Sequence, residues 1–208
     1  MARAEPVREE AKALCETAHW CAERGWVPAT SGNFSIRNAA SGRIYISRSG
    51  LDKGRMTPSD LVVLNAAGRI VRGAGTPSAE TVLHTVIYRD RPDANAILHV
   101  HTVWNTLIGS RFASTGQFGL TGYELLKALD GVATHEHHEV VPVLANTQDY
   151  QELSVQLTEV LRERAEAHGV LLSAHGLYTW GKSVEEARRH LEALEFLFEV
   201  EGIRIFGV

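Results

Sequence analysis

The chain has 208 residues, 44% of them hydrophobic, and a formal net charge of −4. This length is sufficient for a sizeable core, and residues 1–208 are expected to form a single domain. The negative balance argues against nucleic acid and against an anionic membrane surface as partners, and no apolar stretch reaches the length of a transmembrane helix. The two cysteines, Cys15 and Cys21, fit neither a metal pair nor a disulfide within one helix. Together with a charged N-terminus that lacks an apolar signal core, they predict a cytoplasmic protein.

The first third of the chain is predicted to form one helix and two hairpins. Apolar residues recur at helical spacing after Pro6, and Gly25 ends the pattern. Short apolar runs bounded by polar, glycine-containing turns then indicate antiparallel pairs of strands. The first expected strand is short and follows a polar turn within residues 29–37, and the others are residues 43–47, 61–64 and 70–71.

Helices and strands alternate in the rest of the chain. Residues 139–144 are predicted to form an edge strand, because Pro142 has no backbone N–H for a second ladder. The apolar run over residues 170–181 is predicted to be a strand that is interrupted around His175 and then resumes. The expected helices are residues 79–88, 102–110, 120–129, 150–168 and 184–202.

Two histidines stand two positions apart on a strand that is predicted to be buried. In the run Ile-Leu-His-Val-His at residues 97–101, alternation places the rings of His99 and His101 on one face. Apolar neighbours make unsatisfied imidazoles costly, and a divalent metal ion would satisfy both rings at once. His175, beside a glycine that permits close approach, is a candidate third ligand. Three histidines would leave a coordination position open for substrate. The alternative is that His99 and His101 hydrogen-bond within the core or lie at an exposed strand end.

Two polar loops contain the groups that a phosphate site needs, namely hydroxyls, backbone N–H groups and a cation. They lie around residues 30–33 and 47–53, and Ser78 at a predicted helix start would join them. Two ordinary turns are the alternative, since loops rich in serine and glycine are common. The candidate phosphate ligands are Asn33, Ser47, Ser49, Gly50, Lys53 and Ser78.

Glu80 and Glu124 are the carboxylates predicted to move protons. Each stands early in a predicted helix, where complementing the helix dipole is the simpler role. The sequence alone does not choose between them. The other histidines are predicted to pack or to lie at the surface: His19, His84, His168 and His190 on helices, and His135, His137 and His138 in a solvated loop.

Taken together, the motifs resemble the class II aldolase/adducin family. They are Thr-Ser-Gly-Asn-Phe-Ser at residues 30–35, Ile-Ser-Arg-Ser-Gly-Leu-Asp-Lys at 46–53, Pro-Ser-Ala-Glu at 77–80, Leu-His-Val-His-Thr at 98–102, Leu-Thr-Gly-Tyr-Glu at 120–124 and Ala-His-Gly-Leu-Tyr-Thr-Trp-Gly at 174–181. The first four occur across the family. The last two are similar to its dehydratase branch.

The resemblance implies a fold, a cofactor and an assembly. The fold is an α/β domain with three α/β/α layers and a mostly antiparallel central sheet, and the assembly is a homotetramer. Each subunit would bind one Zn²⁺ ion through His99, His101 and His175 and would remove water from a sugar phosphate. Glu124 matches the acid/base glutamate of the dehydratases. Glu80 matches a carboxylate that acts at the metal in the aldolases, and here it is either a displaceable neighbour of the metal or a second acid.

Two other functions fit the same motifs. A class II sugar-phosphate aldolase or pentulose-phosphate epimerase would use similar metal chemistry to break or remake a carbon–carbon bond. A non-catalytic, adducin-like interaction domain would have lost the metal ligands, whereas the three histidines and Glu124 are all present. The product separates the enzymes, because an aldolase releases an aldehyde and a dehydratase conserves the carbon skeleton.

Overall fold

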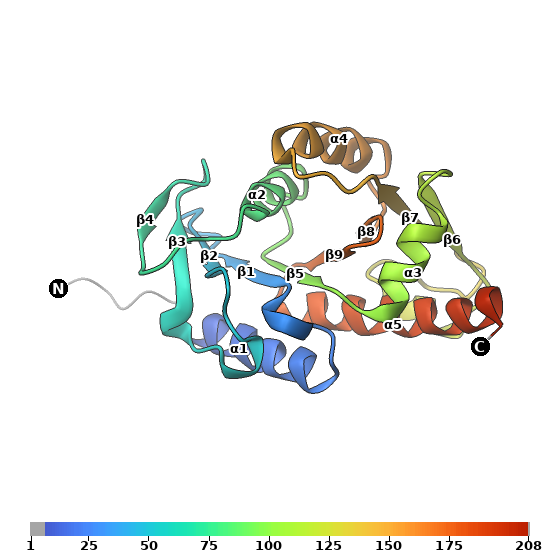
Figure 1. Cartoon of the computed structure of the whole chain (residues 1–208), viewed down its shortest axis with the longest axis horizontal. Coiled ribbons are helices and arrows are strands. Elements are labelled where there is room, and N and C mark those ends of the chain that lie inside the picture. The colour runs from blue at the N-terminus through green and yellow to red at the C-terminus, as the bar shows by residue number, and fades with distance from the viewer. Residues whose placement is uncertain (1–6, 208) are drawn as a thin grey trace.

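The computed structural model describes residues 7–207, so the helix start predicted at Pro6 lies outside the described residues. Within the described part, nine strands form one sheet in the order β4-β3-β2-β1-β5-β9-β8-β7-β6 (Figure 1). Neighbouring strands in this part of the chain are antiparallel except β7 and β8, which are parallel. The strands are β1 (Asn33–Arg37), β2 (Ile44–Ser47), β3 (Leu61–Leu64), β4 (Ile70–Arg72), β5 (Ala96–Val100), β6 (Gln117–Leu120), β7 (Glu139–Leu144), β8 (Gly169–Leu172) and β9 (Gly176–Gly181).

Helices cover both faces of the sheet, which makes three layers (Figure 1). On one face lie α1 (Arg8–Glu23) and α5 (Val184–Phe206), with α3 (Val103–Arg111) packed on α5. On the other face α2 (Thr81–Asp90) packs against α4 (Tyr150–Glu163). The short 3₁₀ helices are η1 (Pro28–Thr30), η2 (Lys53–Arg55), η3 (Pro58–Asp60) and η4 (Glu124–Ala128). The predicted α/β/α arrangement with a mostly antiparallel sheet is confirmed.

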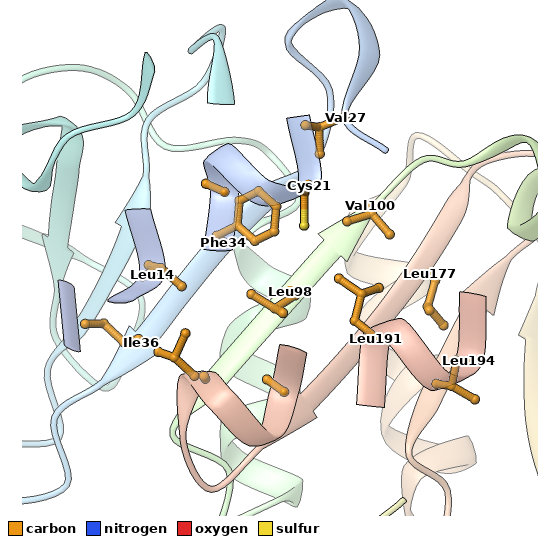
Figure 2. Close-up of a cluster of buried hydrophobic side chains, with 14 of the residues drawn as sticks. Leu14, Cys21, Val27, Phe34, Ile36, Leu98, Val100, Leu177, Leu191 and Leu194 are labelled. Atoms are coloured by element: carbon orange, nitrogen blue, oxygen red, sulfur yellow. The ribbon is translucent and has the colours of Figure 1, made fainter. Parts of the chain in front are cut away.

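Two hydrophobic cores fill the spaces between the layers. On the central strand β5, Leu98 points into the core that the sheet shares with α1 and α5, where Figure 2 shows it near Leu191. The adjacent Ile97 belongs to the core beneath α2 and α4. Both side chains are fully buried, and each such burial contributes about 1.5–3 kcal/mol. Alternation along β5 therefore anchors the strand in both cores, which fixes the backbone that carries His99.

The short helix predicted over residues 120–129 is present only over residues 124–128, as a 3₁₀ helix. β6 ends at Leu120, and Gly122 has a left-handed φ of +83°, which no α-helix contains. The short 3₁₀ helix η4 follows, with Leu126 buried against the core on the α5 side. Glu124 therefore begins a short 3₁₀ segment rather than an α-helix.

β7 is not the edge strand that Pro142 predicted, because it pairs with β6 on one side and with β8 on the other. The β8 ladder involves only Val143 and Leu144. Pro142 lies just before this ladder begins, so its missing N–H removes no bond to β8. At this end of the sheet the edge strand is β6.

The run over residues 170–181 forms two strands rather than one interrupted strand. β8 and β9 are antiparallel, and the chain reverses between Leu172 and Gly176. Ala174 in this turn has a left-handed φ of +52°. The break that the sequence predicted is therefore a hairpin turn, and it carries His175.

The helix ends differ from the predicted ones by a few residues. α3 starts directly after Thr102, whose hydroxyl accepts the backbone N–H of Asn105 and so caps the helix. α4 ends at Glu163, earlier than predicted, and α5 continues to Phe206, where Gly207 closes it. No helix between residues 7 and 207 has the length and apolar character needed to cross a membrane.

A buried carboxylate links β7 to the segment that precedes β8. The fully buried side chain of Glu139 accepts the backbone N–H of His168 at 3.1 Å, lies 3.1 Å from that ring's Nδ1, and lies 3.0 Å from Nε2 of His137. Burial raises the pKa of Glu139, but the two imidazoles outweigh it and the net shift is downward. Burial lowers the pKa of His168, but Glu139 outweighs it and the net shift is upward.

We expect this pair to stabilise the fold most between pH 4.5 and 6.5, the ordinary pKa values of the two groups. The folded-state pKa of Glu139 is lowered, so the stabilisation from its ionised form is lost as the pH falls through that pKa. The folded-state pKa of His168 is raised, so the stabilisation from its protonated form is lost as the pH rises through that pKa. A His168→Gln variant should lose about 1–3 kcal/mol of unfolding free energy near pH 6 and less near pH 9, measured by urea unfolding. A loss that does not change with pH would contradict a charged pair.

Candidate active site

Three histidines from two neighbouring strands meet at one end of the sheet. His99 lies in β5, His101 follows that strand, and His175 lies in the turn before β9. Antiparallel pairing of Val100 with Leu177 brings this turn against the end of β5. One ring nitrogen from each histidine lies within 4.8 Å of the others. The structure thus brings together the three residues that the sequence predicted as metal ligands.

Gly176 makes this close approach possible. A Cβ at this position would lie 2.4 Å from the carbonyl oxygen of Val100 and 2.9 Å from Cε1 of His99. A larger residue would therefore push the turn that carries His175 away from the other two rings. The glycine that the sequence singled out beside His175 is required by sterics.

The rings of His99 and His101 are oriented so that their Nε2 atoms face each other. Nε2 of His99 lies 2.9 Å from Nε2 of His101. In two of the three histidines the Nδ1 atom has a hydrogen-bond partner. Nδ1 of His99 lies 3.0 Å from the Leu177 carbonyl oxygen, and Nδ1 of His175 lies 3.2 Å from Oδ1 of Asn146. Metal-binding histidines typically have such a partner on the second nitrogen. Tyr178 adds a further constraint by stacking on His99 with ring centroids 3.8 Å apart.

Burial favours the neutral form of the imidazoles, which is the form that binds a metal ion. It lowers the pKa of His99 well below its ordinary value and lowers the pKa of His101 to about 4, with the neighbouring histidines adding to the effect. Neutral rings with converging lone pairs suit a divalent transition metal. The donor set therefore fits the kind of ion that the sequence predicted.

Glu80 lies at the same point, at the N-terminal end of α2. Its carboxylate is 3.1 Å from Nε2 of His175 and 3.6 Å from Nε2 of His99, and it accepts a hydrogen bond of 2.6 Å from Nδ2 of Asn33. Burial raises the pKa of Glu80, but His175, His99 and Asn33 outweigh it and hold the pKa well below its usual range. An ionised carboxylate beside three imidazoles can be a fourth ligand or a proton acceptor.

Asn33 and Ser78, two of the predicted phosphate ligands, hydrogen-bond Glu80, and the set as a whole differs in accessibility. The amide of Asn33 is already committed, since Nδ2 donates to Glu80 and Oδ1 lies within hydrogen-bond distance of His84. The Ser47 hydroxyl is buried and accepts the N–H of Phe34. Ser49 and Gly50 are exposed and Ser78 is half-buried. The backbone N–H of Ser49 donates to Thr76, which places this loop beside the segment that carries Ser78.

Lys53 is buried beside the same site. Its ammonium donates to the carbonyl oxygens of Thr30 and Leu51 at 3.0 and 2.9 Å. Burial lowers its pKa to about 8, although Asp52 and Glu80 act in the opposite direction. The ammonium uses two of its three protons in these bonds.

Glu124 is not part of this cluster within its own chain. It lies at the start of η4, its side chain is 71% exposed, and it forms ion pairs with Lys127 and His135. An apolar groove runs beside it, lined among others by Leu125, Ala193 and Phe196. None of the three clustered histidines lines that groove in the described part of the chain. The two glutamates that the sequence could not rank therefore occupy different places.

Some residues around the cluster were not predicted to take part in it. His84 is fully buried under the site and hydrogen-bonds Ser35 and Asn33, so it supports the residue that holds Glu80. Asn146, which holds His175, gave no sequence signal. Tyr178 belongs to a motif that the sequence singled out, but its stacking on His99 depends on the pairing of β5 with β9.

Comparison with known proteins connects this geometry to a family. A family model described as "Class II Aldolase and Adducin N-terminal domain" matches residues 12–201. The chain belongs to the class II aldolase/adducin family. Relatives in this family include a protein of Methylococcus capsulatus named methylthioribulose-1-phosphate dehydratase, 50% identical over 195 residues that cover 94% of this chain and 93% of the relative. A protein of the same name from Stenotrophomonas maltophilia is 46% identical over 201 residues, covering 96% and 93%.

Solved class II aldolase structures share the fold. An L-fuculose 1-phosphate aldolase aligns with a TM-score of 0.79 at 25% identity, covering 96% of this chain and 88% of the other. The L-fuculose-1-phosphate aldolase of Thermus thermophilus aligns with a TM-score of 0.75 at 27% identity, covering 96% and 97%. The class II aldolase fold that the motifs predicted is confirmed, and its histidine cluster can hold a metal ion.

Proposed function

We propose that this chain is a methylthioribulose-1-phosphate dehydratase that holds one zinc ion per subunit at His99, His101 and His175. The observation that carries the proposal is the convergence of three imidazoles and the Glu80 carboxylate, in a chain that is 42–50% identical to relatives of that name. Zinc is chosen because three nitrogen ligands with an open position are typical of catalytic zinc sites. The two cysteines are buried free thiols, which supports a reducing cytoplasm as the place of action.

The proposed reaction removes water from 5-methylthioribulose 1-phosphate, as in methionine salvage. The C3–H bond and the C4–OH bond break, and water leaves with the C3 proton and the C4 hydroxyl. The enol that remains becomes 5-methylthio-2,3-dioxopentyl phosphate. A bound zinc ion supplies Lewis acidity at the ketone, which makes the C3 proton more acidic. The residues of the chain must supply the base, the acid and the anchor for the phosphate.

Proton transfer is assigned to Glu124, which would take the C3 proton and deliver it to the departing C4 hydroxyl. Since Glu124 is exposed and pairs with Lys127 and His135 rather than with the clustered histidines, we propose that it serves the site of a neighbouring subunit in a homotetramer. The apolar groove beside Glu124, with Phe196 52% exposed, is the surface that such a subunit would cover. Glu80 remains the resident carboxylate, as a displaceable ligand or a second proton carrier.

The phosphate is assigned to the two polar loops near Glu80. Ser49, Gly50 and Ser78 offer accessible hydroxyl and backbone groups. Lys53 supplies positive charge beside them, and the negative charge of a phosphate would raise its lowered pKa again. Asn33 and Ser47 are assigned a supporting role behind the residues that contact the phosphate. Their side chains already hydrogen-bond the Glu80 carboxylate and the backbone N–H of Phe34. In this arrangement the two loops bind the phosphate group of the substrate, and the C2 ketone lies at the three histidines.

The test is an assay of purified, zinc-loaded protein with 5-methylthioribulose 1-phosphate, followed by mass spectrometry. We expect a product that has lost one water and kept all its carbon atoms. L-Fuculose 1-phosphate is the matched control, because the fold neighbours carry that substrate in their names. Formation of an aldehyde and a shorter phosphate from either sugar would instead show an aldolase, and no turnover of either would refute both assignments.

A further inference from the structure

A buried glutamate on α5 lies outside the candidate active site but connects to it. The side chain of Glu195 is 4% exposed. Its Oε2 accepts a hydrogen bond of 2.7 Å from the Thr102 hydroxyl, and its Oε1 accepts one of 2.8 Å from Nδ2 of Asn105. Its chain neighbour Leu194 and the nearby Phe198 lie in the hydrophobic core. A carboxylate is costly to bury without hydrogen bonds, so these two donors are what makes Glu195 tolerable at this buried position.

The two donors hold the chain on both sides of His101. The Thr102 hydroxyl also accepts the N–H of Asn105 at 3.0 Å, and Oδ1 of Asn105 accepts the N–H of Thr102 at 3.2 Å, which caps α3 reciprocally. Nδ2 of Asn105 additionally donates to the carbonyl oxygen of Val100 at 3.3 Å. The backbone of His101 is thus fixed by the residue before it and the residue after it, and its N–H donates to Trp26.

The same helix reaches the third histidine. The Thr106 hydroxyl lies 3.3 Å from the carbonyl oxygen of His175 and 3.4 Å from Oδ1 of Asn105. The first turn of α3 therefore touches both chain segments that carry the histidines, the end of β5 and the β8–β9 turn. Glu195 connects this turn to α5, which packs along β5 and β9.

We propose that Glu195 is a positioning residue that sets the affinity of the site for its metal ion. It accepts hydrogen bonds from Thr102 and Asn105. These bonds hold the start of α3 in place, and the start of α3 in turn fixes the backbone around His101 and the carbonyl of His175. This inference rests on the metal site of the proposed function. Its chemistry is that of an acceptor, so a neutral side chain of the same shape should replace it. Burial raises the pKa of Glu195 to about 7 although Thr102 and Asn105 act against this, which agrees with a position that tolerates the uncharged form.

The test measures the zinc dissociation constant of the full-length protein by competition with a chromophoric chelator, using zinc alone. Glu195→Ala leaves two donors without an acceptor and is expected to weaken zinc binding about tenfold or more. Glu195→Gln keeps an acceptor for Asn105 and a polar group beside Thr102, and its zinc affinity should stay within about threefold of the parent. Circular dichroism at the assay temperature establishes that each variant is folded.

Glu201→Ala is the matched control, because Glu201 is equally buried on α5 but binds Tyr123 and Arg204 instead. We expect it to lose stability without losing zinc affinity. Unchanged zinc affinity in Glu195→Ala, or an equal loss in Glu195→Ala and Glu201→Ala, would overturn the inference. A parent protein that binds no zinc would instead refute the proposed metal site, so the two failures are distinguishable.

A second variant keeps the inference falsifiable if Glu195→Ala does not fold. Thr106→Val has nearly the same shape and removes the hydroxyl that faces His175. It should weaken zinc binding several-fold, whereas Thr158→Val on α4, whose hydroxyl donates within its own helix, should leave it unchanged. Equal zinc affinity in the two threonine variants would contradict the proposed network.

Discussion

A His99→Ala variant is expected to lose both its bound metal and its dehydratase activity. His99 is fully buried, its Nδ1 is held by the Leu177 carbonyl, and its Nε2 lies 2.9 Å from that of His101. Removing it takes away one of the three proposed nitrogen ligands. Loss of an outer-shell partner typically costs about 10–100-fold in metal affinity, and loss of a direct ligand should cost more. Inductively coupled plasma mass spectrometry of the purified variant gives the zinc content, and the carbon-conserving product gives the activity.

His190→Ala is the control for this experiment, because it removes another buried histidine. His190 accepts the N–H of Asp130 and its other nitrogen lies 2.8 Å from the Trp180 carbonyl oxygen, outside the cluster. We expect its zinc content to equal that of the parent even if its melting temperature falls. A His99→Ala protein that retains zinc in the same ratio as the parent would refute the metal assignment.

The part of the candidate site that could be predicted is the part that depends on local spacing. Two histidines two positions apart share a face of a strand, and the apolar run around them predicts burial on both sides. The structure has His101 just beyond the end of β5, yet its ring still faces that of His99. Residue spacing alone is therefore enough to predict that the rings of His99 and His101 lie side by side.

The third histidine could only be suggested, because its position depends on tertiary pairing. His175 reaches the pair through the register of β9 on β5 and through the absence of a side chain at Gly176. The sequence indicated a break in an apolar run, but a break does not say whether the chain resumes or reverses. The left-handed φ of Ala174 and the antiparallel pairing of β8 with β9 make it a hairpin.

The two glutamates show where local pattern carries no information. Both stand near the start of a predicted helix, but α2 begins beside the histidines whereas η4 lies beside an exposed groove. What distinguishes Glu80 is the hydrogen bond from Asn33 on β1, a residue 47 positions away. Glu195 differs from these two, because an acid within an apolar helical stripe is a local signal of a buried, hydrogen-bonded carboxylate.

Glu124→Gln is expected to lower turnover at least about a hundredfold without changing the zinc content, because a neutral amide cannot take the C3 proton. The exposed carboxylate forms ion pairs with Lys127 and His135 rather than with the three proposed metal ligands, and such pairs contribute little to stability at a solvent-exposed position. Glu80→Gln should instead lower zinc content as well, since Glu80 lies 3.1 Å from Nε2 of His175. Metal analysis and turnover on the same preparations separate the two roles, and near-parent turnover in Glu124→Gln would remove it from the mechanism.

If Glu124 serves a neighbouring subunit, two inactive variants should restore each other. Chains with Glu124→Gln keep the three histidines, and chains with His99→Ala keep Glu124. A mixed assembly therefore contains some sites in which intact histidines from one chain meet an intact Glu124 from the other. Random mixing should return about a quarter of the parent turnover per site, because each half is intact in about half of the chains. The measurement is the activity of the two variants co-expressed, compared with each variant alone. A mixture as inactive as its components would show that Glu124 acts within its own chain, and the groove beside η4 would then have to close over the histidines of the same subunit.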